Sequence, residues 1–228
     1  MYFWKCWRDT RSFALVFLVM AAAAMPITAL VSKGMNLQEG FGPGAFLSTF
    51  ALILFVVALG LGTIGAIQEF TDKTAHFLFT KPRPRFYFVW AGWVVGCAEL
   101  LAIALMNLLT GWLTLAHYGK SPLWSVLFGL LKKQNIGGVL LYTLFVYCLT
   151  YAMTVVLRNG LKGLGASMGI IMGLAVIAAA IRARWQVDVP IPVEHIGSLP
   201  MVASNLIWIS VALLFVFAAQ LVVERAEI

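Results

Sequence analysis

The sequence predicts an all-α integral membrane protein, a single transmembrane domain of six helices that covers residues 1–228. Of the 228 residues, 62% are hydrophobic and only 11% are charged, whereas soluble domains carry about 25% charged residues. The charges lie mostly between long apolar stretches. An α-helix needs roughly 20 such residues to cross the hydrocarbon core. A backbone in hydrocarbon also has to bond within its own segment, which favours helices.

Six apolar stretches meet the length requirement. Five contain no charged residue, and the third is interrupted only by Glu99. The expected spans are residues 13–32, 45–67, 87–117, 136–157, 163–181 and 204–223. The first of them is long enough to cross the membrane, so we expect it to be a helix of the protein and not a cleaved signal.

Aromatic and basic residues alternate ahead of the first span, from Trp4 through Trp7 and Arg8 to Arg11. This pattern favours a short N-terminal interfacial helix, with its indole rings at the membrane surface and its cations toward phosphate. An ordinary aromatic belt at the start of the first span is an equally good interpretation.

The basic residues indicate orientation. The net charge of +7 does not imply a nucleic-acid partner, because Lys and Arg lie in the turns between spans. Six spans place ten basic residues on the side of both termini and six on the other side. The ten are Lys5, Arg8, Arg11, Lys73, Lys81, Arg83, Arg85, Arg158, Lys162 and Arg225. The positive-inside rule therefore predicts that both termini lie in the cytoplasm. We expect a multi-pass protein of the cell (inner, cytoplasmic) membrane.

Glycine patterns inside the spans predict packing. The stretch 60–65, Gly-Leu-Gly-Thr-Ile-Gly, has the letters of a dinucleotide-binding loop but lies within a span, where glycines let helices approach closely. Gly165, Gly169 and Gly173 share one face of the fifth span and predict a helix contact surface, with a subunit interface as one form of it. No phosphate loop ending in Gly-Lys-Ser/Thr occurs, so we do not expect this chain to hydrolyse ATP.

Neither catalytic nor metal-binding residues are predicted. His76, His117 and His195 lie in different segments, without the i, i+4 spacing of a helical metal site. Glu99 is the one ionisable group deep in an apolar run, and Asn107 follows about two helical turns later. Such acids usually face the bundle interior and mark a transport pathway, but a hydrogen bond that packs two helices together is the alternative.

The loop between the second and third spans carries the most specific pattern. Residues 69–80 form an amphipathic, helix-compatible stretch that includes Phe77 and Leu78, and Pro82 and Pro84 end it. Such an element suits a membrane surface or a groove in a partner protein.

This loop resembles the signature of ABC-2 type transporter permeases, Glu-x-x-x-Gly-Thr followed by Leu-Leu-x-x-Pro-x-x-Arg. The residues that fall in this order are Glu69, Thr74, Leu78, Pro82 and Arg85. Lys73 replaces the usual glycine of the first part, and Trp93 stands after Gly92 where the family has a lysine.

The resemblance implies a permease subunit of an ATP-binding cassette exporter, whose loop is similar to a coupling helix that docks on a separate ATPase subunit. It implies two copies of that ATPase, which hold ATP and magnesium, and a second permease subunit that is identical or different. This chain itself is expected to hold no cofactor. The residues expected to couple are Glu69, Lys73, Thr74, Phe77, Leu78, Pro82 and Arg85. The apolar composition slightly favours a hydrophobic substrate, and an intramembrane enzyme or a membrane accessory or scaffold subunit are the alternatives.

Two further stretches are expected on the outer side. Residues 122–133 have a mostly helical apolar spacing that suggests an interfacial or re-entrant helix. The proline-rich segment 182–200 resembles the lid that the family has before its last span, with a flexible loop as the alternative.

Overall fold

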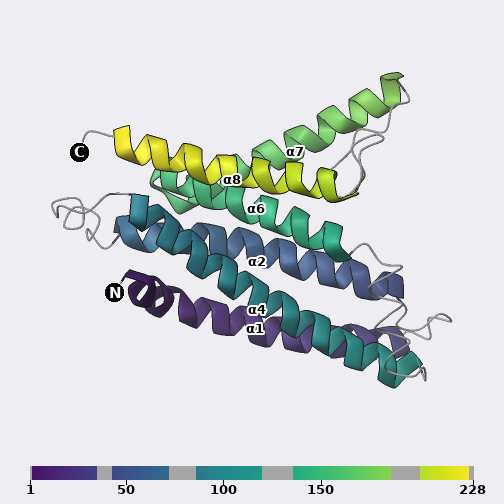
Figure 1. Cartoon of the computed structure of the whole chain (residues 1–228). Coiled ribbons are helices and arrows are strands. Elements are labelled where there is room, and N and C mark those ends of the chain that lie inside the picture. The colour runs from purple at the N-terminus through teal and green to yellow at the C-terminus, as the bar shows by residue number, and fades with distance from the viewer. Residues whose placement is uncertain (1, 35–42, 72–85, 120–135, 186–200, 226–228) are drawn as a thin grey trace.

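The computed structural model describes residues 2–34, 43–71, 86–119, 136–185 and 201–225, and within these ranges the chain forms six long α-helices and no strand (Figure 1). The helices are α1 (Tyr2–Gly34), α2 (Pro43–Thr71), α4 (Phe86–Gly119), α6 (Ile136–Leu157), α7 (Gly160–Trp185) and α8 (Met201–Arg225). Each is long and apolar enough to cross a membrane. The prediction of an all-helical chain with six helices of sufficient length and apolarity is thus confirmed in the described ranges.

Several helices extend beyond the predicted spans. Helix α4 has 34 residues, about 51 Å at 1.5 Å per residue, so its ends project beyond a hydrocarbon core of about 30 Å. The segment that we expected to form an interfacial helix belongs to α1 without a break. A separate short helix is therefore not seen there, and the position of this segment relative to the membrane stays a prediction.

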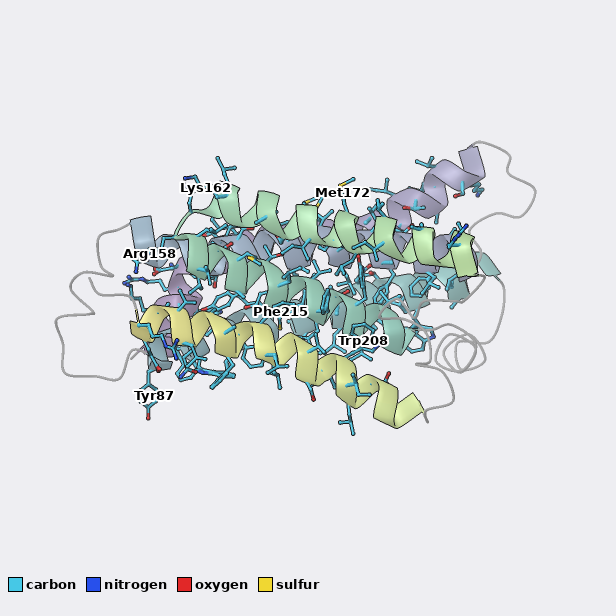
Figure 2. All side chains as sticks on the ribbon, turned by 90° about the horizontal axis from the view of Figure 1, so that it is seen from above. Tyr87, Arg158, Lys162, Met172, Trp208 and Phe215 are labelled. Carbon is cyan, nitrogen blue, oxygen red and sulfur yellow. The ribbon has the colours of Figure 1, made fainter. Side chains whose placement is uncertain are left out.

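Helix α6 is the centre of the bundle. It packs against α2, α4, α7 and α8, and 14 of its 22 residues are buried, whereas most of α7 is exposed or half-buried. Figure 1 shows it between the α7 and α8 side and the α2 and α4 side. On its α8 side the Phe145 ring meets Trp208 and Phe215 edge to face, at centroid distances of 6.1 and 5.7 Å. Figure 2 shows both α8 residues along the same side of the bundle.

A second cluster joins α1, α2, α4 and the start of α6 in the half of the bundle away from the chain ends. Met25, Phe46 and Ala104 are buried in it. The Phe46 ring occupies the space where a side chain at Gly111 would lie. Glycine at this position therefore lets the aromatic ring of α2 lie directly on the α4 backbone.

The start of α1 and the end of α8 lie at the same end of the bundle (Figure 1). Tyr87, Arg158 and Lys162 lie at that end as well (Figure 2). A chain with an even number of spans has both termini at the same end of the bundle. That this end faces the cytoplasm stays a prediction.

A tight turn joins α6 and α7. Arg158 has a positive φ of 50°, the left-handed conformation that commonly ends a helix. The Asn159 side chain then accepts a hydrogen bond from the Lys162 backbone N–H at 3.1 Å, which caps the first turn of α7. A Cβ at Gly163 would lie 2.5 Å from Thr154 Oγ1, so glycine lets α7 fold back closely on α6.

Three expected elements fall outside the described residues. These are the coupling stretch from residue 72 onward, the outer stretch 122–133 and the part of the lid-like segment from residue 186 onward.

Candidate functional site

Glu99 lies at a buried contact between α1 and α4. Its side chain is only 8% exposed, and the Thr10 hydroxyl donates a hydrogen bond of 2.6 Å to Glu99 Oε1. The same hydroxyl lies 3.0 Å from the Cys6 carbonyl of its own helix. The second carboxylate oxygen has no hydrogen-bond partner among the described residues. This is the geometry that the helix-packing alternative expects, and a role of Glu99 in a transport pathway stays a prediction.

Asn107 is fully buried further along α4, and neither its amide nitrogen nor its oxygen has a hydrogen-bond partner in the described part of the chain. It lies three residues after Ala104 and four before Gly111, both of which pack against α2. Burial of an unpaired amide costs about 1–3 kcal/mol. Asn107 therefore does not stabilise this arrangement through a hydrogen bond of its side chain, and its role in a transport pathway stays a prediction.

Two tyrosines join α6 to α4. Tyr147 donates a hydrogen bond of 3.1 Å to the Trp93 carbonyl, and Tyr151 donates one of 2.7 Å to the Val89 carbonyl. Donors and acceptors are both four residues apart, so the pairs repeat with the helical turn. The sequence alone does not predict this contact, because tyrosines in a span resemble ordinary aromatic packing.

Glycines make room for both hydroxyls on α4. A Cβ at Gly92 would lie 2.7 Å from the Tyr151 hydroxyl, and one at Gly96 would overlap the Tyr147 hydroxyl. The available signal was the spacing of Gly92 and Gly96 on one face of the third span, together with Tyr147 and Tyr151 at the same spacing.

The same tyrosine segment also contacts α2. A Cβ at Gly62 would lie 3.1 Å from the Tyr147 carbonyl, and one at Gly65 would lie 3.9 Å from the Tyr151 ring. At Gly60 it would lie 2.6 Å from the Phe17 ring of α1. The packing interpretation of the glycines in 60–65 is therefore confirmed.

Indole groups add two polar contacts to α4 near its start. Trp90 Nε1 donates a hydrogen bond of 2.7 Å to Gln220 of α8, whose amide donates one of 2.9 Å to Glu224. Trp93 Nε1 lies 3.2 Å from Cys148 Sγ of α6. The start of α4, which follows the motif-bearing loop, is thus bonded to both α6 and α8.

The residues expected to couple are placed only in part. Glu69 lies in the last turn of α2, which the structure continues through Thr71. The other six, Lys73, Thr74, Phe77, Leu78, Pro82 and Arg85, lie outside the described residues. The two helices that flank the loop, α2 and α4, both pack on the Tyr147–Tyr151 segment. Helices α2, α4 and α6 are therefore joined at this segment.

Gly165, Gly169 and Gly173 face open space in the described part of the chain, with no atom within 4 Å of an added Cβ. They are not part of a helix contact within this chain as described. Contact with another subunit stays a prediction.

The described residues contain no group of three His, Cys, Asp or Glu side chains placed to hold a metal ion. The arrangement supplies helix contacts and buried polar groups. No protein-family model, no curated protein and no solved structure matches the chain.

Proposed function

We propose that this chain is the permease subunit of an ATP-binding cassette exporter that moves a hydrophobic substrate with ATP hydrolysed by a separate subunit. The observation that carries the proposal is the order and spacing of Glu69, Thr74, Leu78, Pro82 and Arg85, from the end of α2 through the segment that leads to α4, between two helices able to cross a membrane. In this proposal the protein lies in the inner membrane of the cell, and the loop and both termini face the cytoplasm.

The packing of the helices that flank the loop supports a mechanical role for the loop. Helices α2 and α4 flank the loop and meet on Tyr147 and Tyr151 of α6. Helix α1 is tied to α4 through Thr10 and Glu99. In the proposed mechanism, closure of the ATPase subunits displaces the loop, and these contacts pass the displacement to four helices as a unit. Such a transfer needs two arrangements of the bundle, biased by the partner.

The unpaired polar atoms of Glu99 and Asn107 fit a second arrangement. A bundle that opens a path for substrate gives buried polar groups access to water or to neighbouring side chains, which removes the cost of leaving them unpaired. The packed state described above then corresponds to a closed bundle.

The alternatives make different demands on the chain. An intramembrane enzyme needs several polar groups that converge at depth, and among the described residues the hydrogen bond of the Glu99 carboxylate comes from Thr10. A membrane accessory or scaffold subunit needs no docking element. Neither accounts for the motif in the loop.

Purification of the tagged chain from its native membrane tests the proposal. We expect an ATPase subunit to co-purify, and the mass of the complex to equal two permease subunits and two ATPase subunits. A chain that purifies alone from mild detergent, with no ATPase in crosslinked membranes either, would contradict it.

A further inference from the structure

The first three turns of α1 have two different faces. Cys6 is buried against Ala91 and Val95 of α4, and Thr10 is buried where its hydroxyl meets Glu99. These contacts fix the segment on α4, so its exposed side has a defined direction.

The exposed side of the same turns combines aromatic with basic side chains. Its members recur at helical spacing: Phe3, Trp4, Trp7, Arg8 and Arg11. Phe3, Trp4 and Trp7 are 54%, 62% and 42% exposed. We call this surface the Trp-Arg face.

Contacts within the Trp-Arg face hold its groups in place. The Trp4 and Trp7 rings lie 5.0 Å apart, and the Arg11 guanidinium lies over the Trp7 ring at 5.9 Å from its centroid. Arg8 approaches Asp9 at 3.3 Å through its Nε alone, and its side chain is 56% exposed. The terminal nitrogens of both arginines therefore remain available to a further anion.

We propose that the Trp-Arg face binds the headgroup of an anionic phospholipid. Exposed indoles favour the boundary between headgroups and acyl chains. A guanidinium fits two phosphate oxygens at once, and it stacks on an aromatic ring without losing that ability. Charge favours an anionic lipid over a zwitterionic one, since the segment carries three cations, Lys5, Arg8 and Arg11, against one acid, Asp9. Arg158 and Lys162 lie at the same end of the bundle, which makes that end basic as a whole (Figure 2).

The Trp-Arg face belongs to a segment that is fixed on α4. The buried residues of the same turns, Cys6 and Thr10, contact α4. In the proposal, the bound lipid therefore lies on the segment that holds Thr10 against Glu99.

Lipid titration of the purified full-length chain, read by native mass spectrometry, tests the proposal with phosphatidylglycerol and phosphatidylcholine as probes. We expect tighter binding of phosphatidylglycerol. Each cation near an anionic surface contributes about fivefold in affinity, so Arg8→Gln with Arg11→Gln weakens binding roughly 25-fold. The matched control is Lys33→Gln with Arg184→Gln, which removes the same charge at the other end of the helices and leaves binding unchanged.

Three results would overturn the proposal. One is equal binding of the two lipids by the unmodified chain, which would leave the face to a protein partner. The others are a tight phosphatidylglycerol complex in the Arg8→Gln, Arg11→Gln variant, and equal losses in that variant and the control. Both arginines are exposed, so the variant keeps its fold, and its helical circular dichroism checks that.

Discussion

Thr10 on α1 donates a hydrogen bond of 2.6 Å to the buried carboxylate of Glu99 on α4, although 89 positions separate the two residues. This contact fixes the start of α1 on the helix that follows the motif-bearing loop. Movement of α4 therefore involves α1 as well.

Thr10→Val removes this hydrogen bond while it keeps the shape of the side chain. We expect a loss of about 0.6–1.7 kcal/mol in unfolding free energy, the range for hydrogen bonds between membrane helices. Titration with sodium dodecyl sulfate measures it. The control is Thr28→Val, because the Thr28 hydroxyl bonds only the Ala24 carbonyl of its own helix.

A double variant separates the pair from general damage to α1. Thr10→Val combined with Glu99→Leu replaces both polar partners by apolar groups, which is close to neutral for a buried pair. If the double variant loses as much unfolding free energy as the Thr10→Val and Glu99→Leu variants lose together, the two residues are not coupled.

Gly96→Ala places a methyl group against the Tyr147 hydroxyl. We expect a loss of about 1–3 kcal/mol in stability from this overpacking, and partial recovery when Tyr147→Phe removes the hydroxyl. The control is Gly169→Ala, which meets no atom within 4 Å and gains up to about 1 kcal/mol of helix propensity. Equal effects of Gly96→Ala and Gly169→Ala on the thermal midpoint would contradict the tyrosine–glycine packing.

Asn159→Ala removes the cap at the start of α7. The Asn159 side chain accepts from the Lys162 N–H, and loss of such a cap costs about 0.5–2 kcal/mol. Asn159→Asp keeps an acceptor at the same place and should retain the stability. Hydrogen exchange of residues 160–163 checks the effect locally, and unchanged protection in Asn159→Ala would exclude a capping role.

The six spans were predictable because hydropathy depends on length and composition alone. Each predicted range lies inside an observed helix, for example 136–157 against Ile136–Leu157. Helix ends were less predictable. The cationic and aromatic residues before the first span suggested a separate helix, but nothing in the residues between Trp4 and Phe13 breaks a helix, and α1 runs through them.

The contacts inside the bundle were not predictable from one sequence. Glu99 was recognised as exceptional, but its partner Thr10 is a common residue in an amphipathic segment, and no local pattern connects positions 89 residues apart. Gly92 and Gly96 were similarly inconspicuous, because only the fold brings Tyr147 and Tyr151 against them. Gly165, Gly169 and Gly173 are the opposite case, because their regular spacing predicted a helix contact that the described part of the chain does not contain. Such a spacing does not say whether the partner helix lies in the same chain.

Both termini are predicted to lie in the cytoplasm. Single cysteines placed at Phe3 and Arg225, in a variant without Cys6, Cys97 and Cys148, should react with a membrane-impermeant maleimide only after the cells are opened. A cysteine at Lys33, at the other end of α1, should react in intact cells. Labelling of residue 3 or 225 from outside would reverse the orientation and place the loop on the wrong side for an ATPase.

The central claim is that the loop between α2 and α4 docks on an ATPase subunit. Phe77→Asp and Leu78→Asp each place a charge in the expected apolar contact, and burial of an unpaired charge costs about 3–5 kcal/mol. Leu161→Asp is the matched control, because this leucine is 84% exposed in the first turn of α7, where a helix tolerates an acid.

The most direct measurement is binding of the purified ATPase subunit to each detergent-purified permease variant, with stimulation of ATP hydrolysis as a second readout. We expect Phe77→Asp and Leu78→Asp to weaken binding by at least about 100-fold, the lower end of that cost, while Leu161→Asp binds and stimulates like the unmodified chain. Unchanged binding and stimulation in both loop variants would show that this loop is not the coupling element and would contradict the assignment as a transporter permease.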